Sequence, residues 1–195
     1  MNRTTRIKIG TLAFLLLLVA LALLFAISVQ GASIAVTIAI VLVALVLGRV
    51  QGHLWREFFK GRRLMSQGHY AEALAHFDRF LAELESRKWL RHAIWLGWSV
   101  YTLRPDVMTL TNIGACDLLL GQFDESERAL KEAIRRDPLA PLPHFNLAVL
   151  SQVKHQPDCR DEFLRRAQDL GYRGKWDDAL IHEITNAYAK VEGRG

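Results

Sequence analysis

The chain has 195 residues, of which 51% are hydrophobic, and its formal net charge is +5 at pH 7. Residues 1–50 hold four basic and no acidic side chains, so residues 51–195 carry only +1 of that charge. A domain that binds nucleic acid keeps a basic face through its folded part, and this charge distribution argues against such a partner. The basic residues instead flank a hydrophobic segment, as is typical of membrane proteins.

The hydrophobic segment runs from residue 9 to residue 48, and its 40 residues include no charged side chain. One helix needs about 20 apolar residues to cross a bilayer, so this length is enough for two. The turn-forming sequence QGAS falls near the middle, at positions 30–33. The sequence therefore predicts a membrane anchor over residues 1–50, with transmembrane helices at about 9–29 and 32–49.

The charges around this segment also predict its orientation. Basic residues precede and follow it, whereas the turn is uncharged. Because basic flanks stay on the cytoplasmic side, we expect an integral protein of the plasma or inner membrane, held in the lipid bilayer by residues 9–49, with the next domain in the cytoplasm. Two alternatives stay open: a single tilted helix, or a cleaved signal peptide with residues 1–8 as its basic region. Either could place that domain on the other side.

The part after residue 51 contains residues that recur at offsets typical of helical repeats. The recurring elements are Gly61 and Gly114, Gly68 and Gly121, Tyr70 and Phe123, and the Asn-aliphatic-small triplets at 112–114 and 146–148. In each unit the first glycine lets two helices approach closely, and the second ends the first helix in a left-handed conformation. The aromatic residue then opens a second helix, and Pro138 ends the second unit because proline cannot continue a helix.

These residues resemble the tetratricopeptide repeat (TPR) family. Residues 111–138 look like a nearly complete repeat, and residues 61–83 are similar to another. A third unit matches only in its first helix, because His155 and Pro157 stand where the turn glycine and the aromatic residue would be. The resemblance implies a short TPR-like α-solenoid over residues 51–195. Together with the two predicted N-terminal transmembrane helices, it gives an all-α fold. The implied parts are repeats at about 54–87, 107–140 and 141–172, and a C-terminal capping helix at 175–191.

The spacing leaves an inserted segment at residues 88–106 between the first two repeats. It is rich in aromatic residues, and only 12 residues separate its two central arginines, Arg91 and Arg104, too few to span a bilayer. One interpretation is a helix buried between the repeats, and another is a partner site. A third is docking at the membrane surface, since Trp and Tyr favour interfaces. The candidate membrane-interface residues are Trp89, Trp95, Trp98 and Tyr101.

Motifs for catalysis, phosphate binding or metal coordination do not stand out in the sequence. The two cysteines, Cys116 and Cys159, lack the spacing of a disulfide framework or a zinc site, and the seven histidines are scattered. We therefore expect no enzymatic activity, no cofactor, no metal and no small-molecule substrate.

The resemblance also implies a concave groove lined by the first helix of each repeat. The residues of this predicted groove are Trp55, Phe58, Arg62, Met65, Met108, Thr111, Ala115, Leu118, Leu142, Phe145 and Val149. Relatives that clamp a C-terminal carboxylate use polar residues where this chain has Phe58, Thr111 and Ala115, so that ligand class is disfavoured. An apolar groove suits an amphipathic helix or an extended hydrophobic peptide. The alternative is that one of the chain's own segments, such as residues 89–103, fills it.

Two functional hypotheses follow. The first is a membrane-tethered scaffold that binds a protein or peptide partner through the predicted groove. The second is a small structural subunit of a membrane complex, whose hairpin packs with other transmembrane helices while the repeats act as a spacer.

Overall fold

The computed structural model describes residues 49–50, 52–90, 104–174 and 176. All regular elements in these ranges are helical, which confirms the all-α prediction for this part of the chain. Among the described residues no helix has the length and apolar character needed to cross a membrane. The predicted transmembrane helices lie outside the described ranges except for Arg49, as does the predicted capping helix except for Trp176.

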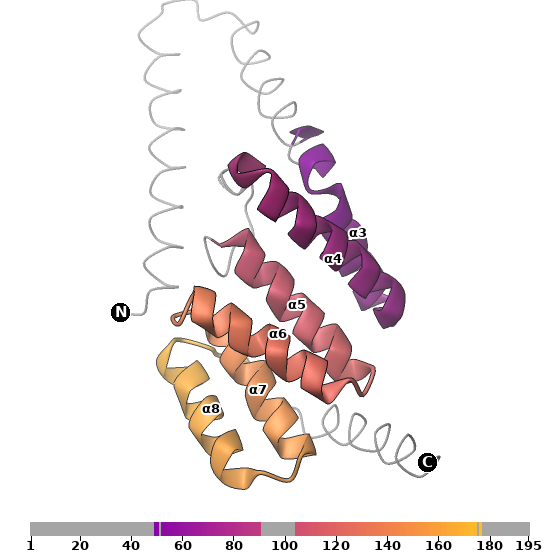
Figure 1. The fold of residues 1–195 in the computed structure, drawn as a ribbon. Helices are drawn as coiled ribbons and strands as arrows, with labels where there is room; N and C mark the ends of the chain where they lie inside the picture. The colour runs from indigo at the N-terminus through magenta and orange to yellow at the C-terminus, as the bar shows by residue number, and fades with distance from the viewer. Residues whose placement is uncertain (1–48, 51, 91–103, 175, 177–195) are drawn as a thin grey trace, which may run out of the picture.

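The helices follow one another as three hairpins (Figure 1). They are α3 (Arg56–Ser66) and α4 (Tyr70–Ser86), α5 (Pro105–Leu119) and α6 (Phe123–Arg136), and α7 (Pro141–Val153) and α8 (Pro157–Asp169). The hairpins stack side by side, with α5 in contact with both helices of the first pair and with α7 of the third. This order and stacking are those of a short α-solenoid.

Each hairpin turns on a residue with positive φ. Gly68 (φ 80°) and Gly121 (φ 76°) occupy the first two turns, as predicted, and the following aromatic residues open α4 and α6. His155 (φ 55°) takes the same position in the third turn, where a side chain is normally disfavoured. Pro157 then occupies the first turn of α8, where its missing N–H costs no hydrogen bond. The third unit is therefore a complete hairpin although its turn residues differ.

A second glycine in each of the first two units lies where the paired helices approach most closely. A Cβ atom on Gly61 would lie 2.7 Å from the Phe77 ring, and one on Gly114 would lie 2.6 Å from Leu130 Cγ. Real Cβ atoms essentially never lie this close to another atom, so a larger residue at either position would force its neighbours to shift. The small residues identified in the sequence therefore set the spacing within the hairpins.

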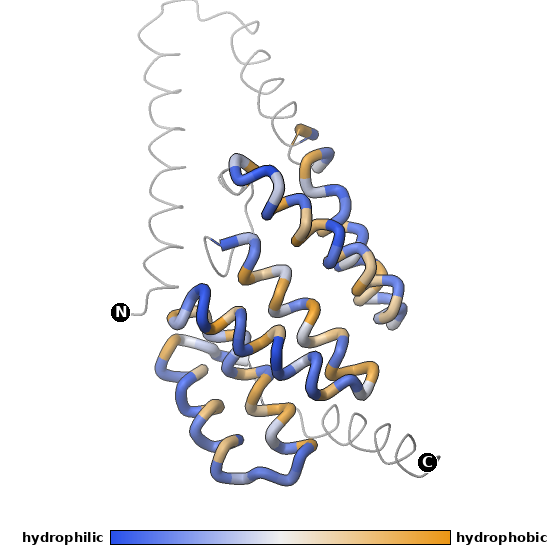
Figure 2. The backbone as a smooth tube through the Cα atoms, viewed as in Figure 1, coloured by the Kyte–Doolittle hydropathy of each residue, from blue (hydrophilic) through white to orange (hydrophobic). Residues whose placement is uncertain are grey.

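The helices differ in how much of their surface is buried. Most residues of α5 and α7 are buried or half-buried, whereas α4, α6 and α8 bury one face and expose the other. Figure 2 shows the same contrast, with more hydrophobic colour along α5 and α7 than along α6 and α8. The first helices of the second and third hairpins therefore form the interior of the stack.

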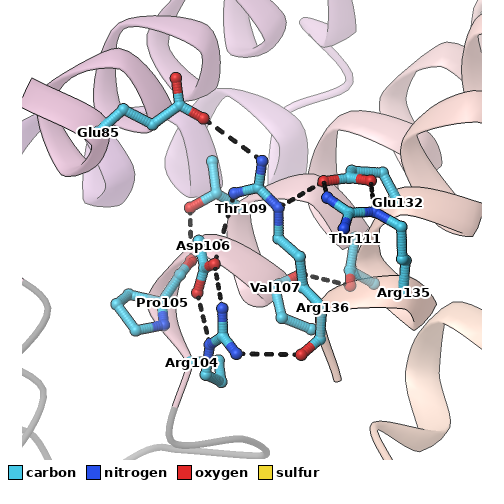
Figure 3. Close-up of polar contacts among 10 residues, drawn as sticks. All are labelled: Glu85, Arg104, Pro105, Asp106, Val107, Thr109, Thr111, Glu132, Arg135 and Arg136. Carbon is cyan, nitrogen blue, oxygen red and sulfur yellow. Dashed lines mark hydrogen bonds and ion pairs between the residues drawn. The ribbon is translucent and has the colours of Figure 1, made fainter. Parts of the chain in front are cut away.

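A polar network joins α4, α5 and α6 where the chain returns from the inserted segment (Figure 3). Asp106 is only 1% exposed, and it accepts hydrogen bonds from Arg104 Nε (3.1 Å) and Nη2 (2.8 Å). Arg136 of α6 reaches Asp106 Oδ2 at 3.4 Å and Glu85 of α4 at 3.3 Å. The pKa of Arg104 is raised, chiefly by its hydrogen bond to Asp106. These contacts fix the start of α5 against α6 of its own hairpin, and Arg136 links this pair to α4 of the first hairpin.

Candidate functional site

A cavity of about 110 Å³ opens where α3, α5 and the start of α7 meet. Its lining is predominantly apolar, and it draws on all three hairpins. The lining residues are Phe58, Arg62, Val107, Met108, Thr111, Asn112, Ala140, Pro141, Leu142 and Pro143.

Part of the predicted groove is brought together here. The members of the predicted groove that line the cavity are Phe58, Arg62, Met108, Thr111 and Leu142. The other lining residues were not predicted. They are Val107 and Asn112 of α5, and Ala140, Pro141 and Pro143 at the start of α7. Prolines at positions 141 and 143 suit the first turn of a helix, but they do not indicate what that turn contacts.

The third-hairpin end of the predicted groove is covered by the chain itself. Phe145 stacks on Tyr172 with ring centroids 4.2 Å apart, and Trp176 meets it edge-on at 5.9 Å. Leu118 and Val149 are buried in the same hydrophobic cluster. The segment of the chain that covers this end of the predicted groove is the one that follows α8. Residues 91–103, the largest part of the inserted segment proposed for that role, lie outside the described ranges.

The remaining members of the predicted groove lie beside these two regions. Trp55 is 3% exposed and packs edge-on against Phe58 (5.6 Å) and Phe80 (5.5 Å), so it belongs to the core of the first hairpin. Met65 is half-buried against the same core. Ala115 is half-buried on α5 and does not line the cavity.

The polar groups at the cavity are few. Thr111 donates its hydroxyl to Val107 O within the helix (2.7 Å), so this group is already satisfied. The exposed Arg62 forms no hydrogen bond or ion pair with any residue in the described ranges, and neither does the half-buried side chain of Asn112. The rim of this apolar cavity thus offers a guanidinium and an amide that have no partner among the described residues.

The titratable groups away from the cavity have structural explanations. Burial and the neighbouring Asp117 raise the pKa of the Cys116 thiol to about 12, so this cysteine is unreactive near neutral pH, whereas Cys159 is exposed. Glu57 accepts a hydrogen bond from His76 Nδ1 at 2.7 Å, and this contact lowers the Glu57 pKa. Within the described ranges no group of three His, Cys, Asp or Glu residues is placed to hold a metal ion.

Of the four candidate membrane-interface residues, the structure describes only Trp89. Its side chain is 55% exposed in a short turn after α4, while the next residue, Leu90, is 1% exposed in the first core. Trp95, Trp98 and Tyr101 lie outside the described ranges.

Comparison with protein families matches part of the chain. Residues 118–151 match the family model described as a tetratricopeptide repeat. This stretch covers the end of α5, all of α6 and most of α7, so it is centred on the second hairpin. The match supports the tetratricopeptide-like interpretation of this part of the chain. No curated protein matches the chain.

Proposed function

We propose that the helical domain is a protein-binding module that a membrane anchor in residues 9–49 holds at the bilayer. The observation that supports the binding role is the apolar cavity shared by three hairpins. The arginine at its rim has no ion-pair partner in the described part of the chain. The tetratricopeptide repeat match supports a role in protein interaction. The uncharged segment of 40 residues with basic flanks supports the anchor.

The size of the cavity suggests what it binds. Pockets for small molecules usually have volumes of roughly 300–1,000 Å³, and this cavity has about 110 Å³. It therefore suits one apolar side chain of a peptide better than a cofactor or metabolite. Burying one such side chain contributes about 1.5–3 kcal/mol, which gives modest affinity unless neighbouring contacts add to it.

Arg62 suggests the character of the residue next to that side chain. Its guanidinium has no acidic partner among the described residues, and arginine binds carboxylates through two parallel hydrogen bonds. Asn112 adds an amide on the neighbouring helix. We therefore propose a peptide that presents an aliphatic or aromatic side chain close to an Asp or Glu residue. The proposal assigns no catalytic step to the domain.

A peptide array probed with the full-length chain in detergent tests this proposal. The chain should bind peptides that combine an apolar residue with a nearby acidic residue, and Arg62→Glu should shift the preference toward Lys or Arg. Arg62 is exposed, so its substitution should leave the fold intact. Arg165→Glu on α8 is the matched control, since Arg165 is also exposed. The same peptide preference in wild type and Arg62→Glu would reject this binding mode.

The position of the domain relative to the membrane is part of the same proposal. Basic residues on both sides of the hydrophobic segment favour a cytoplasmic domain. The exposed Cys159 is a natural reporter, because Cys116 is buried. A maleimide that cannot cross membranes should label Cys159 only after cells expressing the chain are permeabilised. Labelling in intact cells would place the domain on the outside.

A structural subunit of a membrane complex is the second candidate. The observation that favours it is that Tyr172 and Trp176 already cover Phe145, which reduces the surface open to a partner. In that case the array should show no peptide preference, and partners should depend on residues 9–49 alone.

A further inference from the structure

The outer face of α3 is unusual in this domain because it combines basic residues with an exposed aromatic ring. Arg56, Phe59, Lys60 and Arg63 lie three or four residues apart, so they share one face of the helix. All four are exposed, and the Phe59 side chain is 43% exposed. The opposite side of α3 is buried through Phe58 and Gly61.

The positive charge on this face is not compensated locally. Helix α3 contains four basic residues and a single acidic one, Glu57. Glu57 is 7% exposed and points inward to His76, which holds its pKa below the usual range. Arg56 reaches Glu57 at 3.3 Å, but Lys60 and Arg63 form no ion pair with any residue in the described part of the chain.

The exposed cations of α6 behave differently. Arg128 pairs with Glu125 at 2.8 Å, and Lys131 pairs with Glu127 at 2.6 Å. Those pairs leave little net charge on the surface of α6. Lys60 and Arg63, which have no ion-pair partner among the residues that the structure describes, are therefore available to bind an external anion.

We propose that the outer face of α3 lies on the anionic headgroups of a lipid bilayer. Clusters of basic residues next to a membrane segment bind anionic lipids, and α3 follows the predicted anchor within a few residues. The exposed Phe59 ring suits the boundary between headgroups and acyl chains. This inference rests on the anchor proposed above.

The charge of the neighbouring helix favours one orientation. Helix α4 has one arginine against four acidic residues, so an anionic surface would repel it. A nucleic acid would need a broader basic surface than one helix beside an acidic one. With α3 against the lipid, the cavity rimmed by Arg62 of the same helix lies within about one helix diameter, 10–12 Å, of the headgroups. The bound peptide would then belong to a partner that is itself at the membrane.

A fluorescent label at position 59 tests the contact directly. The full-length chain with Phe59→Cys and Cys159→Ser, labelled with an environment-sensitive dye, is reconstituted into phosphatidylcholine vesicles with or without phosphatidylglycerol. Anionic lipid should increase the emission and shift it to shorter wavelength, and high salt should reverse the change because it screens surface charges. A label at Gln168→Cys on α8, at the other end of the stack in Figure 1, should not respond.

Charge-reversal variants provide the second test of the lipid contact. Each basic side chain near an anionic surface changes the bound population roughly fivefold. Lys60→Glu with Arg63→Glu should therefore abolish the response to anionic lipid. Arg165→Glu with Arg173→Glu makes the same change in total charge at exposed positions at the end of the domain and should leave the response intact.

Flotation of the same vesicles separates this inference from the anchor. If the chain floats with both lipids and the label at position 59 responds to neither, the anchor stands and the lipid contact of α3 is wrong. If it floats only with anionic vesicles, the anchor fails and the α3 contact is supported. If it floats with neither, both are wrong. Duplex DNA binding that depends on Lys60 and Arg63 would assign this face to nucleic acid and overturn the proposal.

Discussion

At the scale of single residues, His155 shows how a turn can form without glycine. It is the one non-glycine residue with positive φ in the described ranges, and it takes the position that Gly68 and Gly121 occupy in the other turns. A left-handed conformation costs a residue with a Cβ atom about 1–2 kcal/mol. Packing of α8 against α7 must offset that strain.

The strain at His155 leads to the first prediction. His155→Gly should raise the free energy of unfolding by about 0.5–1 kcal/mol, because relief of strain exceeds the entropy that glycine adds to the unfolded chain. Gly121→Ala at the equivalent turn should lower it by about 1 kcal/mol. Thermal or urea unfolding of the full-length chain in detergent measures both. A loss of stability in His155→Gly would show that the imidazole makes a contact that outweighs the strain.

Asp117 carries the clearest pH dependence. Burial raises its pKa to about 6, with help from the negative charges of Asp78 and Glu125. Because the folded state holds the proton to higher pH than the unfolded chain, this group favours folding most below about pH 4 and opposes it as the pH rises through about 6. A difference of about two between the folded and unfolded pKa values of this group corresponds to about 3 kcal/mol in the free energy of unfolding.

Asp117→Asn should therefore stabilise the domain at pH 7 by about 1–3 kcal/mol and make little difference at pH 4. The measurement is the difference in unfolding free energy between variant and wild type across this pH range. Asp169→Asn, at an exposed position at the end of α8, is the control for a change of the same chemical type. A difference that does not grow with pH would mean that Asp117 is ionised in the folded state at a normal pKa.

At the scale of helices, the close approach within each hairpin is the feature most open to test. Gly114→Ala would place a methyl group 2.6 Å from Leu130 Cγ and 3.2 Å from Ser126 O, so the helices must separate. Such overpacking usually costs about 1–3 kcal/mol. Gly52→Ala is the matched control, because nothing lies within 4 Å of its Cβ position and alanine favours helix. The free energy of unfolding should fall in Gly114→Ala and rise in Gly52→Ala. Equal changes in the two variants would contradict a role for helix spacing.

The hairpins of the first two units were predictable because they depend on local chemistry. Residue type alone indicates the turns at Gly68 and Gly121 and the helix starts at Tyr70 and Phe123. The structure places all four residues as predicted. The sequence pattern matched only the first helix of the third unit, because His155 stands where the repeat has a glycine. His155 nevertheless adopts the positive φ that Gly68 and Gly121 have.

The candidate site was only partly predictable because it depends on contacts between distant segments. The resemblance indicated Phe58, Met108 and Leu142, which do meet at the cavity. It could not indicate that the start of α7 closes one side, or that Tyr172 and Trp176 cover Phe145. Hydrophobic periodicity shows which face of a helix is buried, but it does not show which segment buries it.

At the scale of the whole molecule, the structure separates two surfaces that share one helix. The cavity between α3, α5 and α7 is apolar, and Arg62 at its rim has no ion-pair partner within the described ranges. The outer face of α3 is basic. If both proposals hold, the protein presents a peptide-binding site close to a lipid surface. That arrangement would limit partners to those already at the membrane.

Crosslinking from inside the cavity tests the central claim most directly. A photoreactive phenylalanine replaces Leu142, which lines the cavity, and in a control it replaces the exposed Gln168 on α8. In cells we predict a crosslink from position 142, and none from position 168, to a segment that combines an apolar and an acidic residue, and its loss with Arg62→Glu. Crosslinks from position 142 only to the chain's own residues, or equal capture at both positions, would contradict a partner site in this cavity.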